Sequence, residues 1–282
     1  MTKTVFISGC STGIGFYIAK TLHEKGYQVI ASCRKQPDVE RLQTLGLYTL
    51  KMDVSDNRSI QEAVAQLLGY TNGKLDVLIN NAGFGQAGAL EDISREVMLH
   101  TFQTNVFGLH DLTRQIIPVM RAQGSGRIIN ISSILGQVSL PFRGAYNASK
   151  YAVEGLSDTL RLELEPFGIF VSSIQPGPID SNFRDTVLDI SLKAIDVDHS
   201  FFNSQYKNML HHFKEKKKKS RLTQGPEAVL KKVLHAIEAS RPKPVYTVTL
   251  SAYLLFIARK FLPARCLHQL LAKISKNELS SN

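Results

Sequence analysis

The chain has 282 residues, of which 43% are hydrophobic and 21% are charged. These fractions are typical of a soluble globular protein and exclude a disordered chain, and one α/β domain of this length buries a large core. The formal net charge is +10, but half of this excess comes from the run Lys214 to Arg221, with six positive charges and one negative charge. Because no aromatic residue interrupts this run, we interpret it as a solvated loop and expect no nucleic-acid partner.

The cysteines and apolar stretches indicate the compartment. Three cysteines are too few for a disulfide framework, and their spacing is not that of a zinc site, so we expect no metal. The chain enters a predicted strand almost at once, without an apolar signal core, and the apolar stretch Ala252 to Ile257 is too short to cross a bilayer. We therefore expect a cytoplasmic protein.

The first predicted strand, Thr4 to Ser8, leads into a glycine-rich turn and then a helical pattern from Phe16 onward. Glycines let the backbone approach a pyrophosphate, and the N-terminus of the following helix offers free N–H groups. A tight turn without a ligand is the alternative, but the strand before it and the helix after it favour a phosphate site. The residues of this turn are Gly9, Cys10, Ser11, Thr12, Gly13, Ile14 and Gly15.

The next two predicted strands end in residues suited to an adenosine group. Tyr27 to Ser32 is followed by Arg34, where an acidic residue would bind a ribose hydroxyl and an arginine accommodates a 2′-phosphate. We therefore favour NADP over NAD, the alternative being a solvated arginine. Leu47 to Val54 contains Asp53, which is suited to accept a hydrogen bond from the adenine amino group or to cap the helix near Asn57.

A fourth predicted strand, Leu75 to Asn80, runs into Asn81, Ala82 and Gly83, whose small side chains suit close approach to a flat ligand. A long helical region, Glu91 to Gln123, then carries Asn105 in its interior. Asparagine is a poor helix former, so this side chain either bonds the backbone or water, or serves an active site.

The segment after the fifth predicted strand, Arg127 to Ser132, carries the strongest chemical signal. Ser133 follows the strand, and Tyr146 and Lys150 lie one helical turn apart on one face. An ammonium beside a phenol favours the phenolate, so we expect a lowered Tyr146 pKa, as a general acid/base requires. The pair alone is a weak signal, since an exposed tyrosine beside a solvated lysine is the ordinary interpretation.

Strands alternating with helices predict an α/β fold, a doubly wound parallel sheet of about seven strands with helices on both faces. A sixth strand, Phe170 to Gln175, ends at Pro176, and a seventh follows Pro244. Ligands of such sheets bind beyond the carboxyl ends of the strands. The predicted ligand residues Gly9, Arg34, Asp53, Asn81, Ser133 and Pro176 all fall at those ends.

The remaining segments predict a lid and a tail. We expect residues 1–250 to form one catalytic domain that includes a substrate lid at about residues 180–224. Residues 251–282 form an amphipathic tail, interrupted near Pro263. The tail packs on its own sheet or on a second subunit, or attaches at a membrane surface, and we favour packing.

Several motifs in the same order resemble the short-chain dehydrogenase/reductase family, from Thr4 to about Ser181. The turn Gly9 to Gly15 is similar to the family's TGxxxGIG, with Ser8 in place of the usual Thr, and Asn80 to Gly83 matches NNAG. Asn105, Ser133, Tyr146 and Lys150 match the catalytic tetrad. Pro176 and Gly177 with Ser181 match PGxxxT, again with Ser for Thr.

The resemblance implies hydride transfer between a nicotinamide and a carbonyl or alcohol carbon. It implies that Tyr146 passes the proton, that Lys150 holds the ribose hydroxyls, that Ser133 polarises the carbonyl and that Asn105 anchors a water. It implies adenine contacts for Asp53 and Val54. The full set of implied cofactor residues is Gly9, Ser11, Thr12, Gly13, Ile14, Gly15, Arg34, Asp53, Val54, Asn81, Ala82, Gly83, Tyr146, Lys150, Pro176, Gly177, Ile179 and Ser181.

The long lid and hydrophobic tail look most like the branch of 17β-hydroxysteroid dehydrogenases, retinol dehydrogenases and broad aldehyde reductases. This likeness implies a lipophilic carbonyl or alcohol as substrate and a homodimer or homotetramer. Two alternatives are a nucleotide-binding sensor or scaffold without turnover and an NAD-dependent alcohol dehydrogenase. The complete tetrad places the sensor well behind the enzyme.

Overall fold

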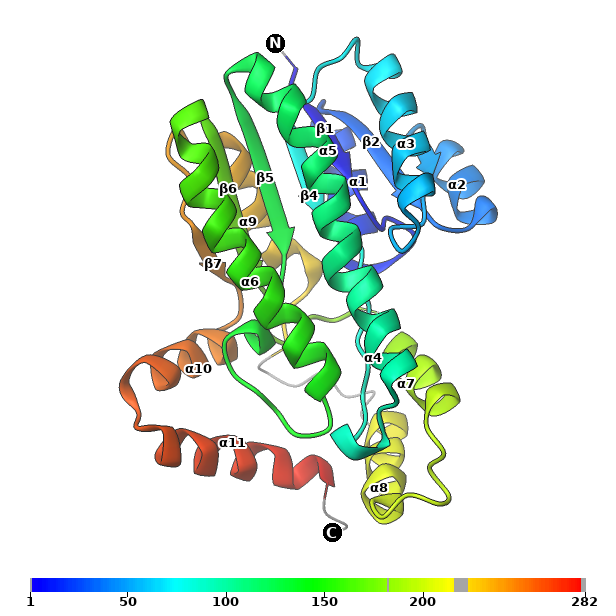
Figure 1. Ribbon diagram of the computed structural model, residues 1–282, viewed down its shortest axis with the longest axis vertical. Helices are drawn as coiled ribbons and strands as arrows, with labels where there is room; N and C mark the ends of the chain where they lie inside the picture. The colour runs from blue at the N-terminus through cyan, green and yellow to red at the C-terminus, as the bar shows by residue number, and fades with distance from the viewer. Residues whose placement is uncertain (1, 182, 216–222, 280–282) are drawn as a thin grey trace.

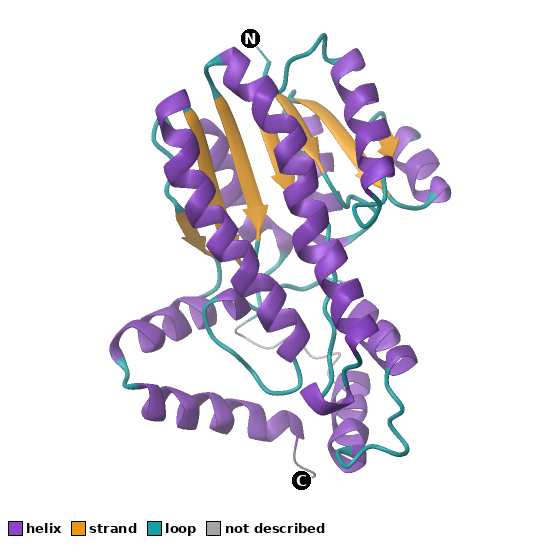
Figure 2. Cartoon of the chain, viewed as in Figure 1, coloured by secondary structure: helices purple, strands orange, loops and turns teal. Residues whose placement is uncertain are grey.

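The computed structural model describes residues 2–181, 183–215 and 223–279, so the basic run from Lys216 to Arg221 lies outside the described residues. Its centre is a seven-stranded sheet in the order β3-β2-β1-β4-β5-β6-β7, with every neighbouring pair parallel (Figures 1 and 2). The strands are β1 (Thr4–Ile7), β2 (Gln28–Cys33), β3 (Tyr48–Lys51), β4 (Val77–Asn80), β5 (Gly126–Ile131), β6 (Ile169–Gln175) and β7 (Val245–Thr247). The predicted doubly wound parallel sheet is confirmed.

Helices cover both faces of this sheet. The helices are α1 (Gly13–Glu24), α2 (Gln36–Gln43), α3 (Asn57–Tyr70), α4 (Arg95–Phe102), α5 (Gly108–Gln123), α6 (Gly144–Leu164), α7 (Phe183–Ala194), α8 (Asn203–Glu215), α9 (Pro226–Glu238), α10 (Leu250–Phe261) and α11 (Ala264–Leu279). In Figure 1, α3, α5 and α6 lie in front of the sheet, and α1 and α9 lie behind it. Short 3₁₀ turns occur at Leu90–Asp92, Ile134–Gly136 and Glu165–Phe167.

The strand sequences explain how two helical layers share one sheet. Successive side chains of a strand point to opposite faces, so a strand covered on both sides is apolar throughout. In β1, Val5 and Ile7 join the core under α1, α2 and α9, whereas Phe6 joins the core under α3, α5 and α6. Both cores are therefore built from the continuous apolar runs that the sequence shows.

The expected helix from Glu91 to Gln123 differs in detail. It begins at Arg95, where Ser94 caps the helix, and a π-helical segment, Gln103–Phe107, separates α4 from α5. A π-turn inside a helix is rare and often marks a functional site. Asn105 lies in this segment, so the irregular turn sets the direction of its side chain.

The chain beyond the carboxyl ends of the strands is more ordered than expected. The segment interpreted as a loose lid contains α7 and α8, and the tail forms α10 and α11, broken between Phe261 and Ala264 as the proline indicated. All four helices lie below the sheet in Figure 2, on the side where the strands end. None of the helices among the described residues is long and apolar enough to cross a bilayer.

Candidate active site

Tyr146 and Lys150 occupy the first half of α6, where the one-turn spacing places them together. The Lys150 Nζ lies 5.7 Å from the centroid of the Tyr146 ring and donates a hydrogen bond to the Ile131 carbonyl at 2.9 Å. Lys150 is buried, with 5% of its surface exposed. The alternative of a solvated lysine beside an exposed tyrosine is therefore wrong.

The pKa of Tyr146 moves in the opposite direction to the sequence-based expectation. Burial raises it to about 12, and an interaction with the Ser133 hydroxyl offsets only part of this rise. Burial also lowers the pKa of Lys150 to about 8, while the nearby Glu154 carboxylate raises it. Desolvation disfavours any charged form, and here it outweighs the attraction between an ammonium and a phenolate. Tyr146 is consequently a neutral phenol near pH 7.

Ser133 sits where β5 ends and the 3₁₀ turn Ile134–Gly136 begins. Its Oγ accepts a hydrogen bond from the Leu135 N–H at 3.1 Å, which fixes the side chain, and the residue is buried. The hydroxyl hydrogen is still able to point elsewhere, because a hydroxyl donates once and accepts twice. Ser133 is thus held near Tyr146 with a donor to offer.

Asn105 holds the backbone that follows the Asn81-Ala82-Gly83 segment. Its Oδ1 accepts from the Phe84 N–H at 3.0 Å, and its Nδ2 donates to the Phe84 carbonyl at 2.9 Å and to Ser149 Oγ at 3.1 Å. A methyl group added to Gly83 would lie 3.0 Å from Asn105 Oδ1 and 3.8 Å from Lys150 Nζ. The Asn105 side chain is therefore bonded to the protein, and it joins the β4 segment to α6.

The glycine-rich turn is tied to the end of β4 by polar side chains. Ser8 Oγ accepts from the N–H groups of Asn81 and Ala82, both at 3.1 Å, and Asn81 Nδ2 donates to the carbonyls of Ser8 and Gly9. The serine that replaces the family's usual threonine thus keeps the hydroxyl that this contact needs. Gly15 packs so closely that an added methyl group would overlap the Gly9 carbonyl oxygen.

The residues around this turn fit a dinucleotide. Gly9 and Gly13 have φ angles of 73° and 61°, so the backbone bends where a side chain would be strained. Among the described residues, no side chain caps α1 and no acidic residue lies in its first turn, which leaves the N–H groups for a phosphate. Across the turn, a methyl group on Gly13 would lie 3.7 Å from Ser181 Cβ. The turn therefore faces the segment that follows β6.

Arg34 is exposed after β2, at the carboxyl edge of the sheet. A second cation, Arg41 of α2, was not marked by any sequence motif. Its guanidinium donates to the Ser11 carbonyl and stands 5.2 Å from the centroid of the Phe16 ring. Only the packing of α2 beside the glycine-rich turn brings it there.

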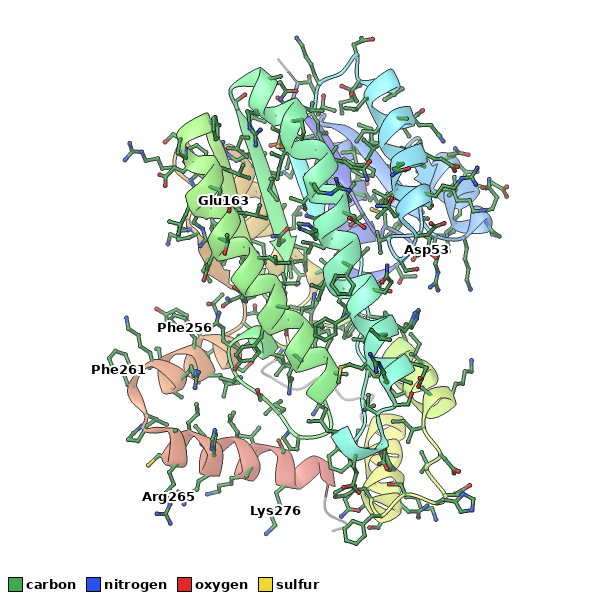
Figure 3. The ribbon with its side chains drawn as sticks, viewed as in Figure 1. Asp53, Glu163, Phe256, Phe261, Arg265 and Lys276 are labelled. Atoms are coloured by element: carbon green, nitrogen blue, oxygen red, sulfur yellow. The ribbon has the colours of Figure 1, made fainter. Side chains whose placement is uncertain are left out.

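Asp53 lies after β3, close to the start of α3 (Figure 3). Its Oδ1 accepts from the N–H and the hydroxyl of Ser55, at 2.9 and 2.7 Å, whereas Asp56 caps α3. Asp53 is therefore not the helix cap that the sequence left open. The buried Val54 follows it.

The segment after β6 reaches both the tail and the Ser133 turn. The Pro176 carbonyl accepts from the Ile134 N–H at 3.0 Å, and a methyl group on Gly177 would overlap Thr249 Oγ1. Ile179 pairs with Gln224, which closes the base of the lid. The predicted residues at the ends of β1 to β6 thus lie along one edge of the sheet, and the strand order reverses there between β1 and β4.

The segment predicted to form a lid packs against Tyr146. The Phe183 and Tyr146 ring centroids are 5.9 Å apart, and a methyl group on Gly85 would overlap Val187. Ser191 Oγ accepts from the Ala87 N–H at 2.8 Å, and Tyr206 Oη accepts from the Ala89 N–H at 2.8 Å. Both lid helices are therefore attached to the segment after β4.

A cavity of about 910 Å³ opens beside another face of α6. Its wall includes Asn147, Ala148 and Tyr151 of α6 together with Leu267 and Leu271 of α11. Tyr146 and Lys150 do not line it, so we do not assign it to the reacting substrate.

Comparisons with known proteins agree with this geometry. Residues 3–189 match the family model described as short chain dehydrogenase. An uncharacterized oxidoreductase, YbbO of Escherichia coli K12, is 40% identical over 96% of this chain and 94% of its own. Human retinol dehydrogenase 8 is 35% identical over 85% of this chain and 79% of its own. A variant of actinorhodin polyketide ketoreductase, solved with NADPH, superposes with a TM-score of 0.69 at 25% identity, covering 88% of this chain and 95% of that chain.

The glycine-rich turn, the Tyr146–Lys150 pair and strands β1 to β6 of the parallel sheet all lie within the matched residues. The similarity to YbbO and to retinol dehydrogenase 8 extends beyond residues 3–189, because these matches cover 96% and 85% of this chain. The chain belongs to the short-chain dehydrogenase/reductase family, whose enzymes are oxidoreductases that use a nicotinamide cofactor.

Proposed function

We propose that this enzyme uses NADPH to reduce lipophilic aldehydes or ketones and that Tyr146 donates the proton. The observation that carries the proposal is the position of the half-buried Tyr146 phenol, which lies one helical turn from the buried Lys150 and interacts with the Ser133 hydroxyl. A protonated acid beside a developing alkoxide serves reduction, whereas alcohol oxidation needs the phenolate. We therefore propose carbonyl reduction as the direction to test first.

When bound, a dihydronicotinamide would provide hydride-donor chemistry at this site. Tyr146 gives its proton to the substrate oxygen, and the Ser133 hydroxyl holds and polarises that oxygen. The Lys150 ammonium has three N–H donors and uses one of them for the Ile131 carbonyl. The other two remain for the ribose hydroxyls of the cofactor. Asn105 fixes the backbone of Phe84, the residue after Gly83, through two hydrogen bonds.

The proposed cofactor contacts follow the edge of the sheet. The glycine-rich turn and the N-terminus of α1 hold the pyrophosphate, and Arg34 binds the 2′-phosphate with Arg41 close by. Asp53 and Val54 hold the adenine, and Ile179 and Ser181 lie toward the nicotinamide. A nearby guanidinium is suited to a phosphate because its donors bind two oxygens together. These two arginines support NADP over NAD.

Two observations support a lipophilic substrate. The lid presents Phe183 and Val187 over Gly85 and the Tyr146 ring, so an apolar wall borders the reacting group. A retinol dehydrogenase is among the relatives that span most of the chain. Retinoids, steroid ketones and medium-chain aldehydes are the compound classes to test.

We also propose a cytoplasmic homodimer. Cys10, Cys33 and Cys266 are free thiols, as a reducing compartment allows. Tyr151 and Leu162 of α6 and Phe107 before α5 are exposed apolar side chains, with Leu162 77% exposed. A second copy covering this face would bury them.

The decisive experiment follows NADPH oxidation by fluorescence with retinal, steroid ketones and medium-chain aldehydes, with NADH assayed in parallel. We expect turnover with NADPH on one of these classes and little with NADH. Tight NADPH binding without turnover of any class would favour a sensor. Equal rates with NADH would contradict the cofactor assignment.

A further inference from the structure

One side of α10 carries a stripe of apolar side chains that are largely exposed in the described structure. Leu250, Tyr253, Leu254, Ile257 and Phe261 recur at helical spacing, so they share one face. Between 39% and 73% of each side chain is exposed. Side chains of this kind at this spacing normally face a core, and here they face outward.

The opposite side of the tail holds α10 and α11 against the body of the protein, so the stripe is not needed for that contact. Ala252 of α10 and Leu267 and Leu271 of α11 are buried against Ile134 and Val138. These two residues belong to the segment that directly follows Ser133. The helices are therefore held to the body by their inner side, and the stripe is left for another partner.

The two tail helices are strongly basic. Residues 250–279, which span α10 and α11, contain five Lys and Arg residues and one acidic residue, Glu278. On α11, Arg265, Lys273 and Lys276 lie on the side away from Leu267 and are exposed. Figure 3 shows Phe261, Arg265 and Lys276 projecting away from the body of the molecule.

We propose that α10 and α11 form a docking surface for an anionic lipid bilayer. The apolar stripe of α10 enters the boundary between headgroups and acyl chains, and the cations of α11 and the adjoining Lys260 contact anionic headgroups. An amphipathic helix with basic flanks binds membranes in this way, without spanning them. From the sequence we expected the tail to pack on protein rather than on a membrane. In this proposal only its inner face does so.

Charge decides between a membrane and a second copy of the chain. A symmetric contact between two copies would bring five cations of each tail together with only one carboxylate, Glu278, in each tail sequence. An anionic lipid surface instead attracts every one of these cations.

The proposal is tested by flotation of the full-length protein with vesicles. One set is pure phosphatidylcholine, and the other contains about 30% phosphatidylglycerol, a composition rich enough in anionic lipid for electrostatic attachment. We expect binding to the anionic vesicles alone. Arg265→Gln with Lys273→Gln should weaken this binding about 25-fold, roughly fivefold for each cation removed.

Leu254→Glu tests the stripe, with Leu45→Glu as a matched control. Leu254 is 56% exposed and Leu45 is 46% exposed, so neither change disturbs a core. We expect Leu254→Glu to reduce vesicle binding at least about tenfold and Leu45→Glu to leave it unchanged. NADPH binding should be unaltered in both, which separates this test from the proposed reaction.

Two results would overturn the proposal. One is failure of the unaltered protein to bind the anionic vesicles, or equal loss of binding with Leu45→Glu. The other is a change of oligomeric state in Leu254→Glu by light scattering without any vesicle binding by the parent protein, which would make the stripe a subunit contact.

Discussion

Glu154 lies one helical turn after Lys150 on α6, and its Oε1 accepts a hydrogen bond from Ser173 Oγ on β6 at 2.6 Å. Glu154 and Lys150 are both buried, with 6% and 5% of their surfaces exposed. The carboxylate raises the pKa of Lys150, which burial lowers to about 8. An ammonium close to the tyrosine is thus maintained at neutral pH by a negative group behind it.

This relationship predicts the alkaline limit of activity. Lys150, which we propose binds the cofactor ribose, is charged below about pH 8 and loses its charge above it, so kcat/KM should fall as pH rises through about 8. Glu154→Gln removes the group that raises the pKa, so the fall should begin at lower pH. Glu163→Gln, an exposed change on the same helix (Figure 3), should leave the profile in place. Identical profiles for all three proteins would contradict the role of Glu154.

Removing the Tyr146 hydroxyl tests proton donation. Tyr146→Phe should lower kcat by about 10²- to 10⁴-fold, the usual contribution of a positioned acid, while NADPH binding and thermal stability persist. Tyr151→Phe, one turn further along α6 and 38% exposed, is the control and should retain activity. Substantial turnover by Tyr146→Phe would mean that another group supplies the proton.

The two arginines near the glycine-rich turn should behave differently. Arg34→Ala should weaken NADPH binding about 10- to 100-fold and NADH binding little, because only NADPH carries the 2′-phosphate. Arg41→Ala should weaken both, since Arg41 also holds the Ser11 carbonyl. Titration of cofactor fluorescence measures the dissociation constants of each variant for NADPH and for NADH. Arg58→Ala, whose side chain is 86% exposed, serves as the control.

Asn105 should contribute to stability as well as to the site. Asn105→Ala removes three hydrogen bonds and leaves the Phe84 N–H and carbonyl without their partner. Buried groups left unpaired cost about 1–3 kcal/mol each, so the loss of partners for these two groups should lower the free energy of unfolding by about 2–6 kcal/mol. Urea denaturation with NADPH absent measures this directly. An unchanged midpoint and slope would show that the network does not stabilise the fold.

The lid attachment at Tyr206 should affect substrate binding more than chemistry. The Tyr206 hydroxyl accepts from the Ala89 N–H and donates to Asp92 Oδ2, each at 2.8 Å. Tyr206→Phe should therefore raise KM several-fold, about what one or two lost hydrogen bonds predict, with kcat nearly unchanged. Tyr70→Phe, on the surface of α3, is the control. A fall in kcat with unchanged KM would instead connect the lid to the reaction step.

Local sequence determined the layered fold and the order of the site motifs. Apolar runs such as those of β1 and β5 predict buried strands, and the glycine-rich turn and the Tyr146–Lys150 spacing depend only on neighbouring residues. Strand ends differ from the expectation by one to three residues. A parallel sheet then aligns the carboxyl ends of its strands, which is why residues far apart in the chain could be placed at one edge from sequence alone.

Tertiary packing decided what those residues do to one another. Burial reversed the expected shift of the Tyr146 pKa, because desolvation depends on every element around the ring. Arg41 beside Ser11 and Glu154 beside Ser173 join elements that no spacing rule relates. The exposure of the apolar face of α10 also depends on tertiary packing. Helical periodicity shows that an apolar face exists, but only the positions of the surrounding elements determine whether that face is covered.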